Sequence, residues 1–147
     1  MNIRDLIAPD GVNLDLQART PEEAMAELAD LLVRAGVVTD RQAYLEAVRA
    51  REAQGTTAVG FGIAIPHGKS PAVARAGVAF GRSARGIDWP SLDNQPVRLV
   101  FLLAAPEAGD NLHLKMLSHL ARMLMRPEVR ERLLAATKAE EALAALE

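Results

Sequence analysis

The chain contains no cysteine and only a few aromatic residues. Without cysteine it cannot form disulfides, thiolate metal sites or a cysteine nucleophile, and this absence is compatible with either redox compartment. The aromatic side chains are those of Trp89, Tyr44, Phe61, Phe80 and Phe101. Leucine, valine, isoleucine and alanine must therefore fill the core, and we expect its packing to be aliphatic.

Long apolar runs and a large excess of one charge are also missing. The longest apolar run, residues 99–105, is far shorter than the roughly 20 residues that a membrane-spanning helix needs. The N-terminal residues include Asp5 and Asp10 and lack an apolar stretch typical of a signal peptide, so we expect a cytoplasmic protein with no direct membrane insertion. The formal net charge is −2, with both signs interspersed. We therefore expect no nucleic-acid partner.

No internal repeat, low-complexity tract or Gly/Ser-rich linker divides the chain, so we expect a single domain over residues 1–147. Hydrophobic periodicity predicts both strands and helices within it. The expected strands are residues 12–16, 63–65, 77–81 and 97–104. The expected helices are residues 20–35, 39–52 and 112–125, one that begins at Pro127, and a last short helix. This order favours an α/β sheet covered by helices, with the almost continuously apolar strand 97–104 at its centre.

Two predicted helices begin with the sequence pattern of a capping box. Thr20 is followed by Glu23 three residues later, and Thr39 is followed in the same way by Gln42. We expect residues 55–62 to form a loop before the short strand 63–65. Pro66 ends that strand because it has no backbone N–H to donate, and His67 follows directly.

Arg51 continues the apolar stripe of the helix 39–52. It lies seven residues after Tyr44 and three after Val48, so its guanidinium is expected on the buried side, where it needs an anion or several acceptors. A salt bridge with Glu52, or with an acidic residue from elsewhere, is the structural alternative to a functional role.

The helix 112–125 carries two histidines on different faces. Its period places His113 in the middle of the inward sector, with the apolar residues Leu117, Leu120, Ala121 and Leu124. His119 falls among charged residues on the opposite sector, so we expect it to be a surface histidine.

His67 is the candidate nucleophile. A neutral imidazole is competent near pH 7 because its reference pKa is about 6.5. The alternative is a strand-end histidine whose ring only donates to a carbonyl. Gly68, which follows, is interpreted as allowing another molecule to approach the backbone. Phosphoryl transfer depends mainly on positioning and electrostatics, so Arg51, His113 and the first N–H groups of the His113 helix can assist attack by His67 without a metal.

Other sites are excluded by spacing. Residues 68–70 resemble the end of a nucleotide-binding loop, but Ile63 stands where that loop requires its first glycine. For zinc, His113 and His119 lie on different helix faces, and no cysteine can complete a site. We therefore expect no metal and no cofactor.

Residues 51–68 closely resemble the active-site signature of the fructose/mannitol-type enzyme IIA of the bacterial phosphoenolpyruvate-dependent sugar phosphotransferase system. The segment reads REAQGTTAVGFGIAIPHG, and residues 109–117, GDNLHLKML, resemble the second histidine segment of the family. The resemblance extends over essentially the whole chain.

This resemblance implies a phosphotransferase that forms a phosphohistidine intermediate. HPr would phosphorylate His67 on Nε2, the phosphoryl group would pass to an enzyme IIB domain, and Arg51 and His113 would flank it. The family fold is a mixed parallel and antiparallel sheet flanked by helices, which refines the α/β prediction.

The role within the family has three readings. Segments 86–93 and 99–107 resemble fructose-type sugar components, although Trp89 stands where a smaller or different aromatic residue is expected. The main alternative is a nitrogen-regulatory paralogue, a binding module controlled by phosphorylation. A third is an interaction domain that has lost phosphorylation.

Overall fold

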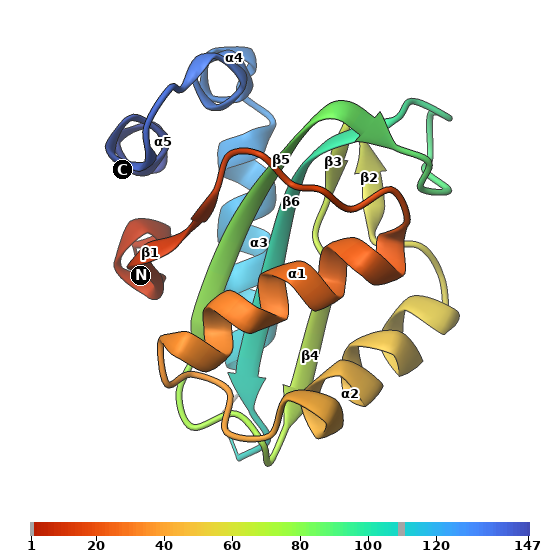
Figure 1. Cartoon of the computed structure of the whole chain (residues 1–147), viewed down its shortest axis with the longest axis vertical. Helices are drawn as coiled ribbons and strands as arrows, with labels where there is room; N and C mark the ends of the chain where they lie inside the picture. Colours follow the sequence, from red (N-terminus) through yellow and green to blue (C-terminus); the bar gives the residue numbers. More distant parts are fainter. Residues whose placement is uncertain (1, 109–110) are drawn as a thin grey trace.

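The computed structural model describes residues 2–108 and 111–147. Gly109 and Asp110, which open the second histidine segment, lie outside the described residues. Along the chain the elements are η1 (Ile3–Leu6), β1 (Ile7–Asn13), α1 (Pro21–Arg34), α2 (Arg41–Ala53), β2 (Ala58–Gly60), β3 (Ile63–Ala64), β4 (His67–Ser70), β5 (Gly77–Ile87), β6 (Val97–Pro106), α3 (Leu112–Leu124), α4 (Pro127–Ala135) and α5 (Ala139–Ala145) (Figure 1).

The strands form one mixed sheet in the order β1-β5-β6-β3-β2, with β4 also paired to β6. Strand β6 is antiparallel to β5 and parallel to β3 and β4, while β1 is parallel to β5. The predicted mixed sheet flanked by helices is therefore confirmed, and so is the central position of β6.

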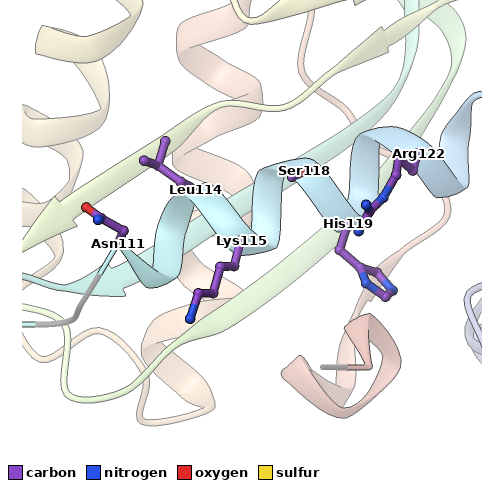
Figure 2. A pocket seen from close by; sticks show the side chains of 6 residues that line it. All are labelled: Asn111, Leu114, Lys115, Ser118, His119 and Arg122. Atoms are coloured by element: carbon purple, nitrogen blue, oxygen red, sulfur yellow. The ribbon is translucent and has the colours of Figure 1, made fainter.

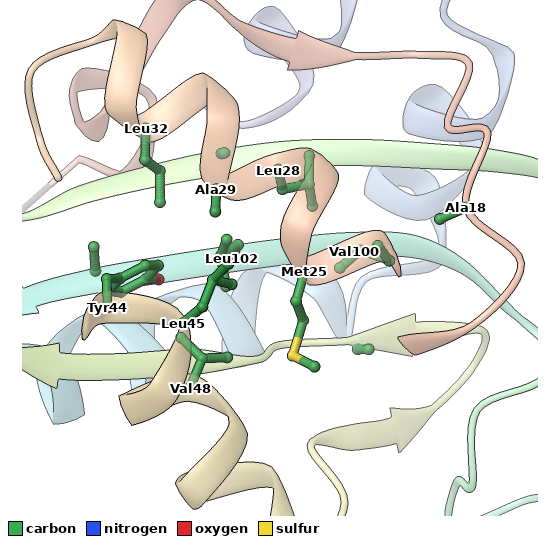
Figure 3. Close-up of a cluster of buried hydrophobic side chains, with 14 of the residues drawn as sticks. Ala18, Met25, Leu28, Ala29, Leu32, Tyr44, Leu45, Val48, Val100 and Leu102 are labelled. Atoms are coloured by element: carbon green, nitrogen blue, oxygen red, sulfur yellow. The ribbon is translucent and has the colours of Figure 1, made fainter. Parts of the chain in front are cut away.

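Helices cover both faces of the sheet. Helices α1 and α2 cross one face, and α3 lies behind the other (Figure 1). Side chains of β6 alternate between two buried clusters. Val100 and Leu102 (Figure 3), together with Ala104, pack with α1 and α2. Leu99, Phe101 and Leu103 pack with α3. This alternation explains why the strand is apolar at almost every position.

The two predicted capping boxes have different outcomes. The Thr20 hydroxyl accepts a hydrogen bond from the Glu23 N–H (3.1 Å), as predicted for the start of α1. The prediction for Thr39 is wrong, because Asp40 caps α2 by accepting from the Ala43 N–H (3.2 Å). The Thr39 hydroxyl instead donates to the Ala72 carbonyl (3.0 Å), so a tertiary partner replaces the local one.

Several predicted strand bounds are also wrong. Strand β1 covers Ile7–Asn13 rather than 12–16, and β5 continues to Ile87. The loop predicted at 55–62 contains β2, which forms a hairpin with β3. Phe61 and Gly62 make its turn with φ angles of 57° and 74°. Paired positive φ angles fit the twist of a two-residue hairpin, although only the glycine adopts them without strain.

Strands β3 and β4 follow one another along the same edge of β6. Ile63 pairs with Leu99 in β3 and His67 pairs with Leu103 in β4, so the register is the same on both sides of the break. The interruption is Ile65-Pro66, and the Leu103 N–H donates to the Pro66 carbonyl (3.0 Å). The predicted end of the strand before Pro66 is confirmed. His67 is the first residue of the next strand, β4, which the sequence did not predict.

Gly68 allows helix α2 to pack closely on β4. A Cβ atom at this position would lie 2.8 Å from Val48 Cγ2 and 3.2 Å from the Val48 backbone nitrogen. The Tyr44 hydroxyl, on the same helix, donates to the buried Leu103 carbonyl (2.7 Å). The close approach that Gly68 permits is therefore that of α2, not that of another molecule as interpreted from the sequence.

We expect Gly68→Ala to destabilise the fold by about 1–3 kcal/mol, because the added methyl group overlaps Val48 on both its side chain and its backbone. Urea unfolding followed by circular dichroism measures the change. Lys69→Ala, at an exposed position on the same strand, is the control and should stay close to the wild type. Equal stability of Gly68→Ala and the wild type would contradict the close packing.

Candidate functional site

The ring of His67 is held by a hydrogen bond to its own chain. His67 is half-buried at the start of β4, and its Nδ1 lies 3.0 Å from the Ile65 carbonyl oxygen. A carbonyl only accepts, so Nδ1 carries the proton and Nε2 keeps a free lone pair. The structural alternative, a ring that donates to a carbonyl, is thus observed, and it leaves the second nitrogen available for chemistry.

The surroundings of His67 favour the neutral ring. Burial lowers its pKa from the ordinary value of 6.5, and the positive charges of Arg51 and His113 lower it further. The hydrogen bond to Ile65 and the carboxylate of Glu52 act in the opposite direction. The net downward shift leaves the imidazole uncharged at neutral pH, which is the nucleophilic form.

Arg51 lies in the last turn of α2 and is partly exposed. One of its terminal nitrogens donates to the Gly55 carbonyl (2.9 Å). None of the salt bridges found within residues 2–108 and 111–147 includes Arg51, so the expected ion pair with Glu52 is not formed there. The charge of this guanidinium lowers the pKa of the His67 ring.

His113 lies in the first turn of α3 and is half-buried. Burial lowers its pKa, and the charge of Lys69 lowers it further. Its Nδ1 is shielded from solvent and has no hydrogen-bond partner in the part of the chain that the structure describes. Asn111 precedes the helix with a φ of 54° and its side chain does not cap it. Within the described residues the Leu114 N–H donates to the Asn111 carbonyl (3.0 Å). The N–H groups of Leu112 and His113, at the positive end of α3, have no partner among these residues and can contact an anion.

The inward face of α3 is shifted slightly from the predicted sector. Its buried residues are Met116, Leu120 and Leu124, whereas Ala121, expected inside, is exposed. His113 precedes Met116 by three residues and so lies at the N-terminal end of this face.

His119 does not lie on the buried face of α3. It lines a depression of about 380 Å³ with Asn111, Leu114, Lys115, Ser118 and Arg122 (Figure 2). The prediction of a surface position is close, because His119 is half-buried on the polar side of the helix.

Glu52 is a site residue that the sequence reasoning treated only as a salt-bridge partner for Arg51. Its carboxylate accepts from the Thr57 N–H (2.9 Å), the Thr57 hydroxyl (2.6 Å) and the Trp89 indole N–H (3.1 Å). In the sequence, only the position of Glu52 within the segment 51–68 indicated that it belongs to the site. Trp89, whose identity departed from expectation, is buried and supplies one of these donors.

The site thus consists of the His67 ring and the charged groups that act on its pKa. Within residues 2–108 and 111–147, no group of three or more His, Asp or Glu side chains could hold a metal ion. In the same residues, no helix is both long enough and apolar enough to cross a membrane. The site therefore presents a neutral imidazole with a free Nε2, on which the charge of Arg51 acts.

The chain is similar in sequence and in fold to known proteins. The sequence model of the family described as "Phosphoenolpyruvate-dependent sugar phosphotransferase system, EIIA 2" matches residues 5–147. The fructose-specific EIIA component of Haloferax volcanii is 49% identical over 125 residues, covering 85% of this chain and 81% of the relative. The nitrogen regulatory protein of Bradyrhizobium diazoefficiens is 42% identical over 142 residues, covering 95% and 91%.

Another relative is much longer. The fructose-specific EIIABC component of Bacillus subtilis is 45% identical over 136 residues, which are 92% of this chain but 21% of that protein. The chain thus corresponds to about a fifth of its length.

Solved structures have the same fold. The nitrogen regulatory protein IIA-Ntr of Neisseria meningitidis superimposes with a TM-score of 0.91 at 32% identity, covering 99% of both chains. A complex of enzyme IIA and phosphorylated enzyme IIB for mannitol from Escherichia coli gives 0.82 at 29% identity, covering 95% of this chain and 96% of the other. The chain therefore belongs to the EIIA type 2 family of the phosphoenolpyruvate-dependent sugar phosphotransferase system.

Proposed function

We propose that this chain is a cytoplasmic phosphoryl carrier, a single domain over residues 1–147 in which His67 receives the phosphoryl group. The donor is an HPr-type phosphocarrier protein, and the acceptor is an enzyme IIB domain of a fructose-type sugar transport system. The observation that carries the proposal is the fixed ring of His67, whose Nδ1 is 3.0 Å from the Ile65 carbonyl, which leaves Nε2 free.

The transfer needs no metal from the protein. The Nε2 lone pair attacks phosphorus, the bond between phosphorus and the donor breaks, and the donor takes back the electron pair. The Nδ1 proton stays on the ring, so the ring becomes positively charged and the Ile65 carbonyl stabilises that charge. The reverse sequence of events passes the group to enzyme IIB, with neutral imidazole as the leaving group. Arg51 and His113 bind the transferring oxygens, where negative charge is concentrated.

A regulatory role is the second candidate. The similarity to nitrogen regulatory proteins, at 42% identity over 142 residues in one relative and a TM-score of 0.91 in one structure, supports it. Incubation with phosphoenolpyruvate, enzyme I, HPr and a fructose-specific enzyme IIB separates the two roles. The sugar carrier supports sugar phosphorylation in this mixture, whereas a dedicated regulator becomes phosphorylated and transfers nothing to sugar.

We expect His67→Ala to take up no acid-labile phosphate from phosphoenolpyruvate, enzyme I and HPr, because the accepting nitrogen is lost. Radiolabelled phosphoenolpyruvate measures the uptake. His119→Ala is the matched histidine control and should be labelled like the wild type. If His67→Ala were labelled like the wild type, His67 would not be the phosphorylated residue. That result would not distinguish a transport role from a regulatory role. A wild-type chain that takes up no phosphate would identify an interaction domain that has lost phosphorylation.

Arg51→Ala and His113→Ala should each keep the fold and slow phosphoryl transfer by about 10²-fold, because each removes a charge or a donor from the transition state. Rapid-quench measurement of transfer from phosphorylated HPr gives the rates. Arg49→Ala, in the same helix, is the control, since Arg49 pairs with Glu22 at 3.4 Å instead. Unchanged rates in both variants would contradict the supporting roles.

The pKa of His67 should be below 6.5 in the wild type, because burial and the charges of Arg51 and His113 lower it. In Arg51→Ala one of these charges is absent, so the midpoint should move upward and the neutral ring should be lost at a less acidic pH. An NMR titration of the His67 ring from pH 4 to 8 measures both midpoints. A variant midpoint at or below that of the wild type would show that Arg51 does not act on the ring.

A further inference from the structure

We propose that Glu52 is a positioning residue for phosphoryl transfer: by binding Thr57 and Trp89 it fixes the peptide that orients the His67 ring. This inference rests on the proposed function, because it concerns how the same ring is held. Glu52 does not act as an acid or base in it.

The carboxylate of Glu52 joins three segments of the chain. It extends from the last turn of α2 and accepts from both the N–H and the hydroxyl of Thr57, at 2.9 and 2.6 Å. The third donor is the indole of Trp89, at 3.1 Å, from the segment between β5 and β6. Thr57 is 5% exposed and Trp89 is 3% exposed. A carboxylate that meets three donors, all of them on buried residues, has a fixed orientation.

The hydrogen bonds continue from Thr57 to the ring. The Thr57 carbonyl accepts from the Ile65 N–H (3.0 Å), and the Ile65 carbonyl lies 3.0 Å from His67 Nδ1. Ile65 lies in the break between β3 and β4. Its backbone is thus held by Thr57 on one side and by the imidazole on the other, and Glu52 fixes Thr57.

The same residue also limits the position of Arg51. Glu52 follows Arg51 directly, and a terminal nitrogen of Arg51 donates to the Gly55 carbonyl (2.9 Å) in the short loop between α2 and Thr57. The loop is therefore held at Gly55 by Arg51 and at Thr57 by Glu52. A change at Glu52 loosens both the loop that holds Arg51 and the peptide that holds His67.

The charges are consistent with a positioning role. A free carboxylate beside a phosphate-accepting ring would repel the incoming group. Here both oxygens of Glu52 accept hydrogen bonds, and no hydrogen bond within the described residues joins Glu52 to His67. The remaining electrostatic effect is to raise the pKa of His67 in opposition to burial.

The test compares Glu52→Gln with Glu46→Gln, a matched change at an exposed position in the same helix. In Glu52→Gln an amide oxygen at Oε2 still accepts from the Thr57 N–H and the Trp89 indole, but an NH₂ group at Oε1 takes away the acceptor of the Thr57 hydroxyl proton. All the remaining hydrogen bonds are then between neutral groups, which are roughly half as strong as those to a carboxylate. Nitrogen-15 NMR of the histidine rings reads the tautomer of His67, and rapid-quench assays read transfer from phosphorylated HPr.

We expect the wild type and Glu46→Gln to hold His67 in the single tautomer with a proton on Nδ1. Glu52→Gln should show mixed tautomers, a lower His67 pKa and transfer slowed by about 10²-fold, as for a misplaced reacting group. Trp89→Phe keeps the two hydrogen bonds between Glu52 and Thr57, so transfer should slow less than in Glu52→Gln. This variant tests the same inference if Glu52→Gln does not fold.

The inference would be overturned if Glu52→Gln kept a single Nδ1–H tautomer and the wild-type rate of transfer. If Glu52→Gln does not fold, a folded Trp89→Phe with the tautomer and transfer rate of the wild type would overturn it. A slower Glu52→Gln that keeps the wild-type tautomer and pKa would also overturn it, because the ring would not be the group affected. The tautomer measurement needs no phosphoryl donor. If the wild type accepts no phosphate, the proposed function fails while the positioning of the ring by Glu52 is still decided.

Discussion

The hydrogen bond between His67 Nδ1 and the Ile65 carbonyl is the constraint on which the candidate site depends. It spans only two residues, so it requires a particular backbone shape at Ile65-Pro66. That shape arises because β3 and β4 share one register along β6 and are separated by Ile65 and Pro66, the second of which has no N–H. The break turns the Ile65 carbonyl to the ring and leaves Nε2 unprotonated. A continuous strand would use that carbonyl in the sheet.

Packing on both faces of the sheet brings the other groups to the ring. Gly68 lets α2 lie against β4, and the last turn of that helix carries Arg51 and Glu52. On the opposite face, the apolar side of α3 packs against β6, and His113 lies at its N-terminal end. The groups that act on His67 therefore come from separate layers, and their position depends on the hydrophobic core rather than on local sequence.

The electrostatic environment of His67 is consistent with the proposed gain and loss of a phosphoryl group. Burial and the positive charge of Arg51 favour the neutral form of the His67 ring. Under the proposed function, the same guanidinium favours a phosphoryl dianion bound to the ring. The family includes sugar carriers and nitrogen regulatory proteins, and this chain is similar to both. A carrier and a switch can use the same site, because both need a phosphoryl group that is stable enough to persist and labile enough to leave.

The sequence by itself determined the mixed α/β class, the central apolar strand, the helix that begins at Thr20 and the three residues His67, Arg51 and His113 as candidates. These follow from periodicity, capping patterns and the segment 51–68, which are local properties of the chain. Only the tertiary structure decided that Asp40 caps α2, that Gly68 serves the packing of that helix, and that Glu52 joins Thr57 to Trp89. The physical reason is that the packing at Gly68 and the hydrogen bond to Trp89 involve partners distant in sequence, whereas the cap of α2 depends on which of two neighbouring side chains, Thr39 or Asp40, accepts the hydrogen bond. Such competition is resolved by packing, which periodicity alone does not specify.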